Sequence, residues 1–182
     1  GRADGSVRIF KKDGKERWKV SGQHGKAIAG IGFRSKTKEW VTVGVDTEIK
    51  IWDDLTGNNV KTFYGPEHPP KTIAVSPDGR LVAVAGEDTR VFVYDAIAGK
   101  LSQVLFGHKD FVNGLAFSPD SKTLASAGSE GLVLLWDVAS GKLKQTMSGH
   151  TDEVNAVAIS PDGGLMASAG ADSTIILWNL TT

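Results

Sequence analysis

The sequence contains no cysteine among its 182 residues. Without a thiol it can form no disulfide framework, no thiolate zinc site and no cysteine nucleophile. A reducing compartment suits such a chain, and we expect it to be cytoplasmic. Net charge is also absent, because 21 lysine and arginine residues balance 21 aspartate and glutamate residues. With no overall field to attract phosphate or anionic lipid, we expect no nucleic-acid partner and no membrane partner.

Long apolar runs and sustained helical periodicity are missing as well. No run approaches the ~20 apolar residues of a membrane-spanning helix, and no stretch repeats its apolar residues about every 3.6 positions. Glycine, in contrast, is plentiful at 22 residues, which indicates many tight turns. We therefore expect one packed core with almost no helix.

A period of 42 residues runs through the whole chain. It is marked by aromatic residues that end short β-type runs, namely Phe10, Trp52, Tyr94, Trp136 and Trp178. An acidic residue stands six positions before each of them: Asp4, Asp46, Asp88, Glu130 and Asp172. The chain is therefore one repeat array of four whole units and a fraction.

Each unit contains four short runs with strand-like alternation, separated by turn residues. In the fourth unit the runs are 111–117, 124–127, 132–136 and 143–147. Four strands in about 42 residues is the composition of a β-propeller blade. The predicted repeats are 1–22 (partial), 23–64, 65–106, 107–148 and 149–182, the last without its outer strand, and they give seventeen strands in all.

These units resemble the WD40 repeat. The matching features are a Gly-His pair as in Gly107-His108, a Ser-Pro-Asp turn as in 118–120 and a Trp-Asp ending as in Trp136-Asp137. The resemblance implies an all-β, WD40-type β-propeller whose blades are four-stranded antiparallel sheets. About four blades and one additional strand are present. We therefore expect the C-terminal part of a longer ring, which in this family commonly has seven blades.

Three units share a histidine, a hydroxyl residue, a carboxylate and a tryptophan at fixed offsets. These sets are His24, Thr42, Asp46 and Trp52; His108, Ser126, Glu130 and Trp136; and His150, Ser168, Asp172 and Trp178. Serine, histidine and aspartate are the residue types of a hydrolase triad, but an active site is not normally copied into three blades. The sets resemble instead the structural tetrad of WD40 repeats, a buried hydrogen-bond chain. We therefore expect no catalytic residue and no enzyme activity.

The third unit departs from this pattern in a coordinated way. Pro66 replaces the histidine, Val84 the hydroxyl residue and Tyr94 the tryptophan, so that only Asp88 remains. Losing the partners together avoids a lone buried polar group. His68 lies two residues late and can be a displaced substitute, a surface residue or a binding contact; we favour the surface residue. No second ligand lies at metal-binding spacing and no glycine-rich loop precedes a helix, so we expect no metal and no cofactor.

The resemblance implies a non-catalytic scaffold that assembles a multiprotein complex through the loops on one face of the propeller. Carried over by position, that face includes Lys26, His68, Lys71, Glu87, Lys109, Asp110, Phe111, Ser129, Asp152 and Glu153. Phe111 stands where the next unit has Glu153, so it is either an exposed anchor or packed against a neighbouring loop. We expect protein partners, and further N-terminal blades or another chain to close the ring. The alternative is an accessory or regulatory module of a larger multidomain enzyme or signalling protein.

Overall fold

The computed structural model describes residues 2–21 and 23–181, and every regular element in these two ranges is a β-strand. The all-β fold predicted from the repeat is therefore confirmed, and the described residues form seventeen strands. They include no helix long and apolar enough to span a membrane. The predicted repeat limits at residues 1, 22 and 182 lie outside the described residues.

The strands form five antiparallel sheets that follow one another along the chain, and we number these sheets as blades 1 to 5. Blade 1 contains β1 (Val7–Phe10) and β2 (Glu16–Val20), and blade 2 contains β3 (Ile28–Arg34), β4 (Glu39–Gly44), β5 (Glu48–Asp53) and β6 (Asn59–Tyr64). Blade 3 contains β7 (Pro70–Val75), β8 (Leu81–Gly86), β9 (Arg90–Asp95) and β10 (Lys100–Phe106). Blade 4 contains β11 (Val112–Phe117), β12 (Thr123–Gly128), β13 (Leu132–Asp137) and β14 (Leu143–Ser148). Blade 5 contains β15 (Val154–Ile159), β16 (Leu165–Gly170) and β17 (Ile175–Asn179).

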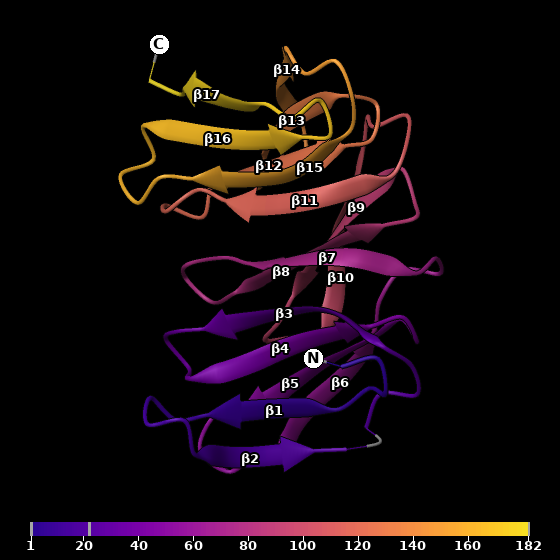
Figure 1. Cartoon of the computed structure of the whole chain (residues 1–182), viewed down its shortest axis with the longest axis vertical. Coiled ribbons are helices and arrows are strands. Elements are labelled where there is room, and N and C mark those ends of the chain that lie inside the picture. Colours follow the sequence, from indigo (N-terminus) through magenta and orange to yellow (C-terminus); the bar gives the residue numbers. More distant parts are fainter. Residues whose placement is uncertain (1, 22, 182) are drawn as a thin grey trace.

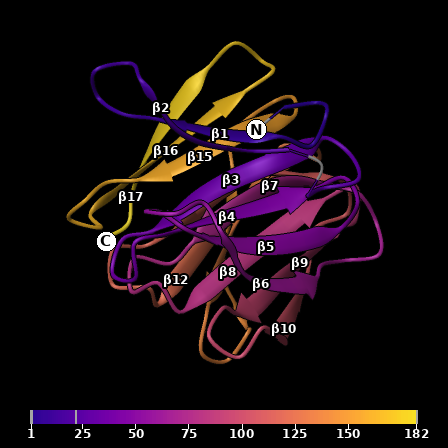
Figure 2. The same cartoon turned by 90° about the horizontal axis from the view of Figure 1, so that it is seen from below.

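Blades 2 to 5 stack through their first strands. The strand β3 packs against β7, β7 against β11, and β11 against β15. The sheets follow one another along the long axis of the molecule, from blade 1 at the bottom of Figure 1 to blade 5 at the top. Figure 2 shows the same stack from below, with the strands of successive sheets turned relative to one another. Strands of blade 1 and blade 5 do not pair with each other, so the described sheets form an open array.

Apolar side chains fill the spaces between blades. In blade 4, Val133 and Leu135 are buried in the cluster that joins this blade to blade 5. Burial of side chains of this size contributes roughly 1.5–3 kcal/mol each. The same positions in blade 5 are occupied by Ile175 and Leu177, which are 73% and 70% exposed. One apolar sheet face of blade 5 is therefore uncovered.

Each blade has its connections at two opposite ends. Because the strands are antiparallel, the loop that enters the first strand and the turn between the second and third strands lie together, on what we call the loop face. The turn between the first and second strands and the hairpin that leads to the outer strand lie on the hairpin face. In blade 4 the first hairpin-face turn is held by Ser118, whose hydroxyl donates to Asp120 Oδ1 (2.6 Å) and accepts from the Thr123 N–H (2.9 Å). Blades 3 and 5 repeat this turn, whereas blade 2 has Arg34 at the serine position.

Candidate functional site

The tetrad of blade 4 is a continuous chain of hydrogen bonds inside the protein. Trp136 Nε1 donates to Ser126 Oγ at 2.7 Å, and Ser126 Oγ lies 2.6 Å from His108 Nε2. The other ring nitrogen, His108 Nδ1, is hydrogen-bonded to Glu130 Oε1. A neutral imidazole with its proton on Nδ1 satisfies every link, because it accepts from the hydroxyl and donates to the carboxylate. Glutamate at the usual aspartate position keeps the link through one oxygen, while its Oε2 is buried without a hydrogen-bond partner in the described residues.

Blade 2 builds the same chain from a different hydroxyl residue. Trp52 Nε1 donates to Thr42 Oγ1 at 2.8 Å, Thr42 Oγ1 lies 2.8 Å from His24 Nε2, and His24 Nδ1 lies 3.0 Å from Asp46 Oδ1. Burial acts to raise the pKa of Asp46, but hydrogen bonds from His24 and the Gly25 N–H outweigh it and hold the pKa below its ordinary value. The carboxylate is therefore ionised at neutral pH and fixes the imidazole.

Blade 5 repeats the arrangement a third time. The distances from Ser168 Oγ to Trp178 Nε1 and to His150 Nε2 are both 2.8 Å, and His150 Nδ1 lies 2.8 Å from Asp172 Oδ2. A hydrogen bond from the Thr174 hydroxyl, above all, holds the pKa of Asp172 well below its usual range. The structure thus brings together all three sets that the sequence singled out.

The burial of the three hydroxyl groups favours a structural role for the tetrads. Thr42 and Ser126 are 0% exposed and Ser168 is 1% exposed. A nucleophile must reach the carbon that it attacks, and these oxygens are enclosed by the imidazole, the indole and the neighbouring strands. Their geometry fits the satisfaction of buried polar groups, each of which costs about 1–3 kcal/mol when left unpaired.

Blade 3 replaces the tetrad by an ion pair. Val84 and Tyr94 are buried, and Asp88 turns to Arg90, whose Nε and Nη2 donate to the two carboxylate oxygens at 2.8 and 2.5 Å. The Arg90 guanidinium holds the pKa of Asp88 below its usual range. His68 is exposed, so it does not substitute for the missing histidine. Sequence reasoning missed Arg90, although an arginine two residues after the orphaned aspartate was a visible signal.

One group of metal-type ligands occurs in the described residues, and two of its three members, His24 and Asp46, belong to the tetrad of blade 2. Ligand atoms of His24, Asp46 and Glu48 lie within 4.8 Å of one another. Both ring nitrogens of His24 are engaged by Thr42 and Asp46, and Glu48 pairs with Lys50 Nζ at 2.7 Å. A cation would have to displace these contacts, so we assign no metal to this group.

The predicted partner-binding residues lie on the loop face, and most of them are accessible. All are exposed except Ser129, which is half-buried and accepts a hydrogen bond from Asn113 Nδ2 at 2.9 Å. The remaining residues are Lys26, His68, Lys71, Glu87, Lys109, Asp110, Phe111, Asp152 and Glu153. The face is therefore a mixed-charge surface on which Phe111 is the one phenylalanine, tyrosine or tryptophan among these residues.

Two of these residues touch each other across a blade boundary. Lys71 Nζ, at the start of β7, lies 4.5 Å from the ring centroid of Phe111, just before β11, and Phe111 remains 42% exposed. Such a cation–π contact contributes about 0.5–1 kcal/mol at an exposed site. Both residues break the repeat, because the other blades have alanine or asparagine at the lysine position and alanine, proline or glutamate at the phenylalanine position. Phe111 therefore packs against Lys71 of the neighbouring blade and still leaves part of its ring exposed to solvent.

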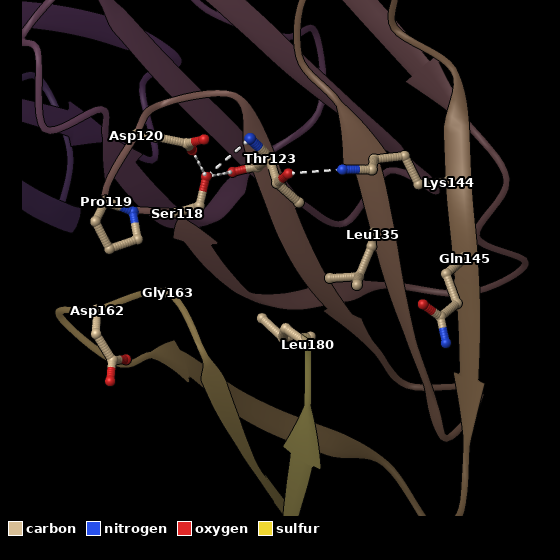
Figure 3. Close-up of a pocket in the computed structure, with 10 residues that line it drawn as sticks. All are labelled: Ser118, Pro119, Asp120, Thr123, Leu135, Lys144, Gln145, Asp162, Gly163 and Leu180. Carbon is tan, nitrogen blue, oxygen red and sulfur yellow. Dashed lines mark hydrogen bonds between the residues drawn. The ribbon is translucent and has the colours of Figure 1, made fainter. Parts of the chain in front are cut away.

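A cavity of about 330 Å³ opens on the hairpin face between blades 4 and 5. Figure 3 shows Ser118 and Asp120 on one side of it, Asp162 of blade 5 facing them, and Leu135 and Leu180 to their right. Its polar groups are largely satisfied within the protein, since Ser118 holds the turn and Lys144 Nζ donates to Thr123 Oγ1 at 3.1 Å. We assign no ligand to this cavity.

Three stretches of the chain, 57–95, 99–137 and 141–179, match the family model described as "WD domain, G-beta repeat" and together cover more than half of the chain. The chain belongs to the WD40 repeat family. WD40 repeats generally mediate protein–protein interaction and are typically non-catalytic. Each matched stretch runs from the outer strand of one blade through the third strand of the next, so repeat and blade are offset by one strand. Comparison with curated proteins gives no significant match.

Proposed function

We propose that this WD40 array is a non-catalytic scaffold that assembles a multiprotein complex by holding a protein partner on its loop face. The observation behind the proposal is the exposed Lys71–Phe111 pair, because it is unrepeated whereas the tetrads are repeated. The tetrads recur in blades 2, 4 and 5 with the same hydrogen bonds, whereas a residue that recognises a partner is needed only once. Exposed aromatic and cationic side chains in loops are frequent interface anchors.

The pair offers two kinds of contact to one partner segment. Lys71 presents an ammonium group at the start of an inner strand, and the exposed part of the Phe111 ring presents apolar area. A peptide with a carboxylate next to an aliphatic or aromatic side chain would use both groups at once. The acidic residues Asp152 and Glu153 of blade 5 lie on the same face and would repel a partner that is acidic along its whole length.

A second surface concerns the assembly of the ring. Ile175 and Leu177 are largely exposed, whereas Val133 and Leu135 at the same positions of blade 4 are buried by the next blade. An apolar sheet face of this kind is normally covered. We propose that a further blade covers it, supplied by the same protein or by another chain. A cytoplasmic location stays a prediction, which microscopy of the tagged protein would test.

Truncation of the aromatic anchor tests the proposed binding face. A partner is first captured with the wild-type protein from a cell extract and identified, and its affinity is then measured for Phe111→Ala and for the control Phe33→Ala. Phe33 is 40% exposed, close to the exposure of Phe111, but lies at the opposite end of an inner strand against Trp40. We expect about a tenfold loss of affinity for Phe111→Ala only. Unchanged affinity, with both variants folded, would remove the loop-face proposal.

A further inference from the structure

A second interblade cavity, of about 370 Å³, opens on the hairpin face between blades 2 and 3. It lies between the outer strand β6, which provides Val60 and Lys61, and the turn after β9, which provides Ala96 and Ile97. The cavity of Figure 3 is lined by residues at the same repeat positions two units later, among them Leu135 and Lys144. The presence of a cavity at this position therefore follows from the repeated blade structure.

The charged residues that line this cavity, in contrast, do not recur at the same positions of the following blades. Arg34 stands where the three following blades have the serine that holds the hairpin-face turn, and Glu39 stands where they have leucine or threonine. Arg34 Nε donates to the carbonyl oxygen of Gly79 at 2.7 Å, and Nη1 pairs with Glu39. Its side chain is only 6% exposed. The remaining nitrogen, Nη2, donates to no group in the described residues, so Arg34, a buried residue that lines the cavity, keeps free N–H groups.

A second cation borders the same cavity. Lys61 Nζ donates to the carbonyl oxygen of Ile97, and because an ammonium group has three N–H donors, two remain. Arg34 and Lys61 together outweigh Glu39 by one positive charge, and Lys36 and Lys38 in the adjoining turn have the same sign. The segment 34–38, which contains Arg34, Lys36 and Lys38, thus supplies one buried arginine.

The rest of the lining is aliphatic. Ile51 is buried at the base of the cavity, while Val60 and Ile97 are 53% and 61% exposed at its rim. Aliphatic side chains exposed to this extent on both sides of a hollow favour a ligand with an aliphatic body.

We propose that this cavity binds an aliphatic carboxylate. The carboxylate oxygens accept hydrogen bonds from Arg34 Nη2 and Lys61 Nζ, and the aliphatic part of the ligand packs against Val60 and Ile97. Charge-assisted hydrogen bonds to guanidinium and ammonium groups are about twice as strong as neutral ones. The group can belong to a small carboxylic acid or to the C-terminal residue of a peptide. Because the cavity lies on the hairpin face, the proposal is independent of binding on the loop face.

The test uses isocaproate as the probe and isocaproamide as its neutral counterpart. Binding to the intact protein is followed by NMR of methyl-labelled valine, leucine and isoleucine. We expect isocaproate to shift the Val60 and Ile97 methyl signals and isocaproamide to bind about tenfold more weakly. Equal affinity of acid and amide, or shifts confined to the cavity between blades 4 and 5, would overturn the proposal.

A conservative variant separates a loss of ligand affinity from a loss of folding stability. Lys61→Gln copies Gln103, the residue at the same position of blade 3, whose amide makes the corresponding bond to the carbonyl oxygen of Ala139. It removes one charge but retains a donor, so we expect an unchanged unfolding free energy and an affinity for isocaproate that is several-fold lower. Unchanged affinity would contradict the role of Lys61. A third arm compares isocaproate with a short peptide that ends in leucine: tighter binding of the peptide identifies a chain terminus, and tighter binding of isocaproate identifies a small acid.

Discussion

The side-chain amide of Gln103, on the outer strand of blade 3, donates a hydrogen bond to the carbonyl oxygen of Ala139 in blade 4 at 2.9 Å. Lys61 does the same from blade 2 to the carbonyl oxygen of Ile97 in blade 3. Donor and acceptor are 36 residues apart in both pairs. A side chain of β6 and one of β10 thus bind the hairpin of the next blade, and the repeat sets the spacing.

We expect Gln103→Glu to lower the free energy of unfolding by about 1 kcal/mol, because it removes the donor and places a carboxylate oxygen against a carbonyl oxygen. Gln103→Lys copies blade 2 and should restore most of the stability, since an ammonium group can donate to the same carbonyl. Denaturant unfolding of the three proteins measures both effects. A glutamate variant as stable as wild type would show that the interblade bond contributes nothing.

Blade 1 is also hydrogen-bonded to the next blade, but here the donor is the indole of a tryptophan. Trp18 Nε1 donates to the carbonyl oxygen of Asp54 at 2.9 Å, again 36 residues along the chain. The ring lies over Gly57, where an added Cβ would come within 2.7 Å of a ring carbon and where φ is +72°. Close approach of the indole and a left-handed backbone both favour glycine at this position.

Gly57→Ala should therefore destabilise the protein through two effects, the left-handed backbone and the collision with Trp18. The matched control is Gly14→Ala, where φ is +80° but nothing lies within 4 Å of the added Cβ. We expect a loss of about 1–2 kcal/mol for the control from the backbone alone and an additional loss on the order of 1–3 kcal/mol for Gly57→Ala. Equal losses in denaturant unfolding would mean that blade 1 is not packed on blade 2 through Trp18.

Burial raises the pKa of Tyr94 to about 12. A raised pKa means that the folded protein holds the phenolic proton more tightly than the unfolded chain, so its contribution to stability is complete below the ordinary value of about 10. That contribution is lost as the pH rises from about 10 to 12. Unfolding free energies of wild type and Tyr94→Phe should diverge over this range, with wild type losing stability faster. Parallel curves would contradict the burial of this hydroxyl group.

Much of the fold follows from the 42-residue period. Alternation of apolar and polar residues in short runs predicts strands, and the repeated aromatic and acidic residues fix where each strand lies in its unit. The seventeen strands and their division into blades can therefore be predicted from the sequence. The tetrads can be read as well, because a buried histidine, hydroxyl and indole must satisfy one another and do so at the same offsets in each blade.

Contacts between blades are harder to read from the sequence. The approach of Lys71 to Phe111, the bond from Gln103 to Ala139 and the cavity beside Arg34 all depend on how one sheet is placed on the next. The period fixes which positions are equivalent, but not how far a side chain reaches across the boundary. Residues that break the repeat were the available signal, and Arg34 was such a residue.

We assign a structural role to the repeated tetrads and partner binding to unrepeated residues. Ser126, which links His108 to Trp136 inside blade 4, is the residue at which this assignment is tested. Ser126→Ala leaves two buried nitrogen atoms without their partner, and we expect the free energy of unfolding to fall by about 2–4 kcal/mol at neutral pH. Affinity for the loop-face partner should stay unchanged under conditions where the variant is folded. Wild-type stability together with a loss of partner binding or of a chemical activity would show instead that the tetrads are functional sites.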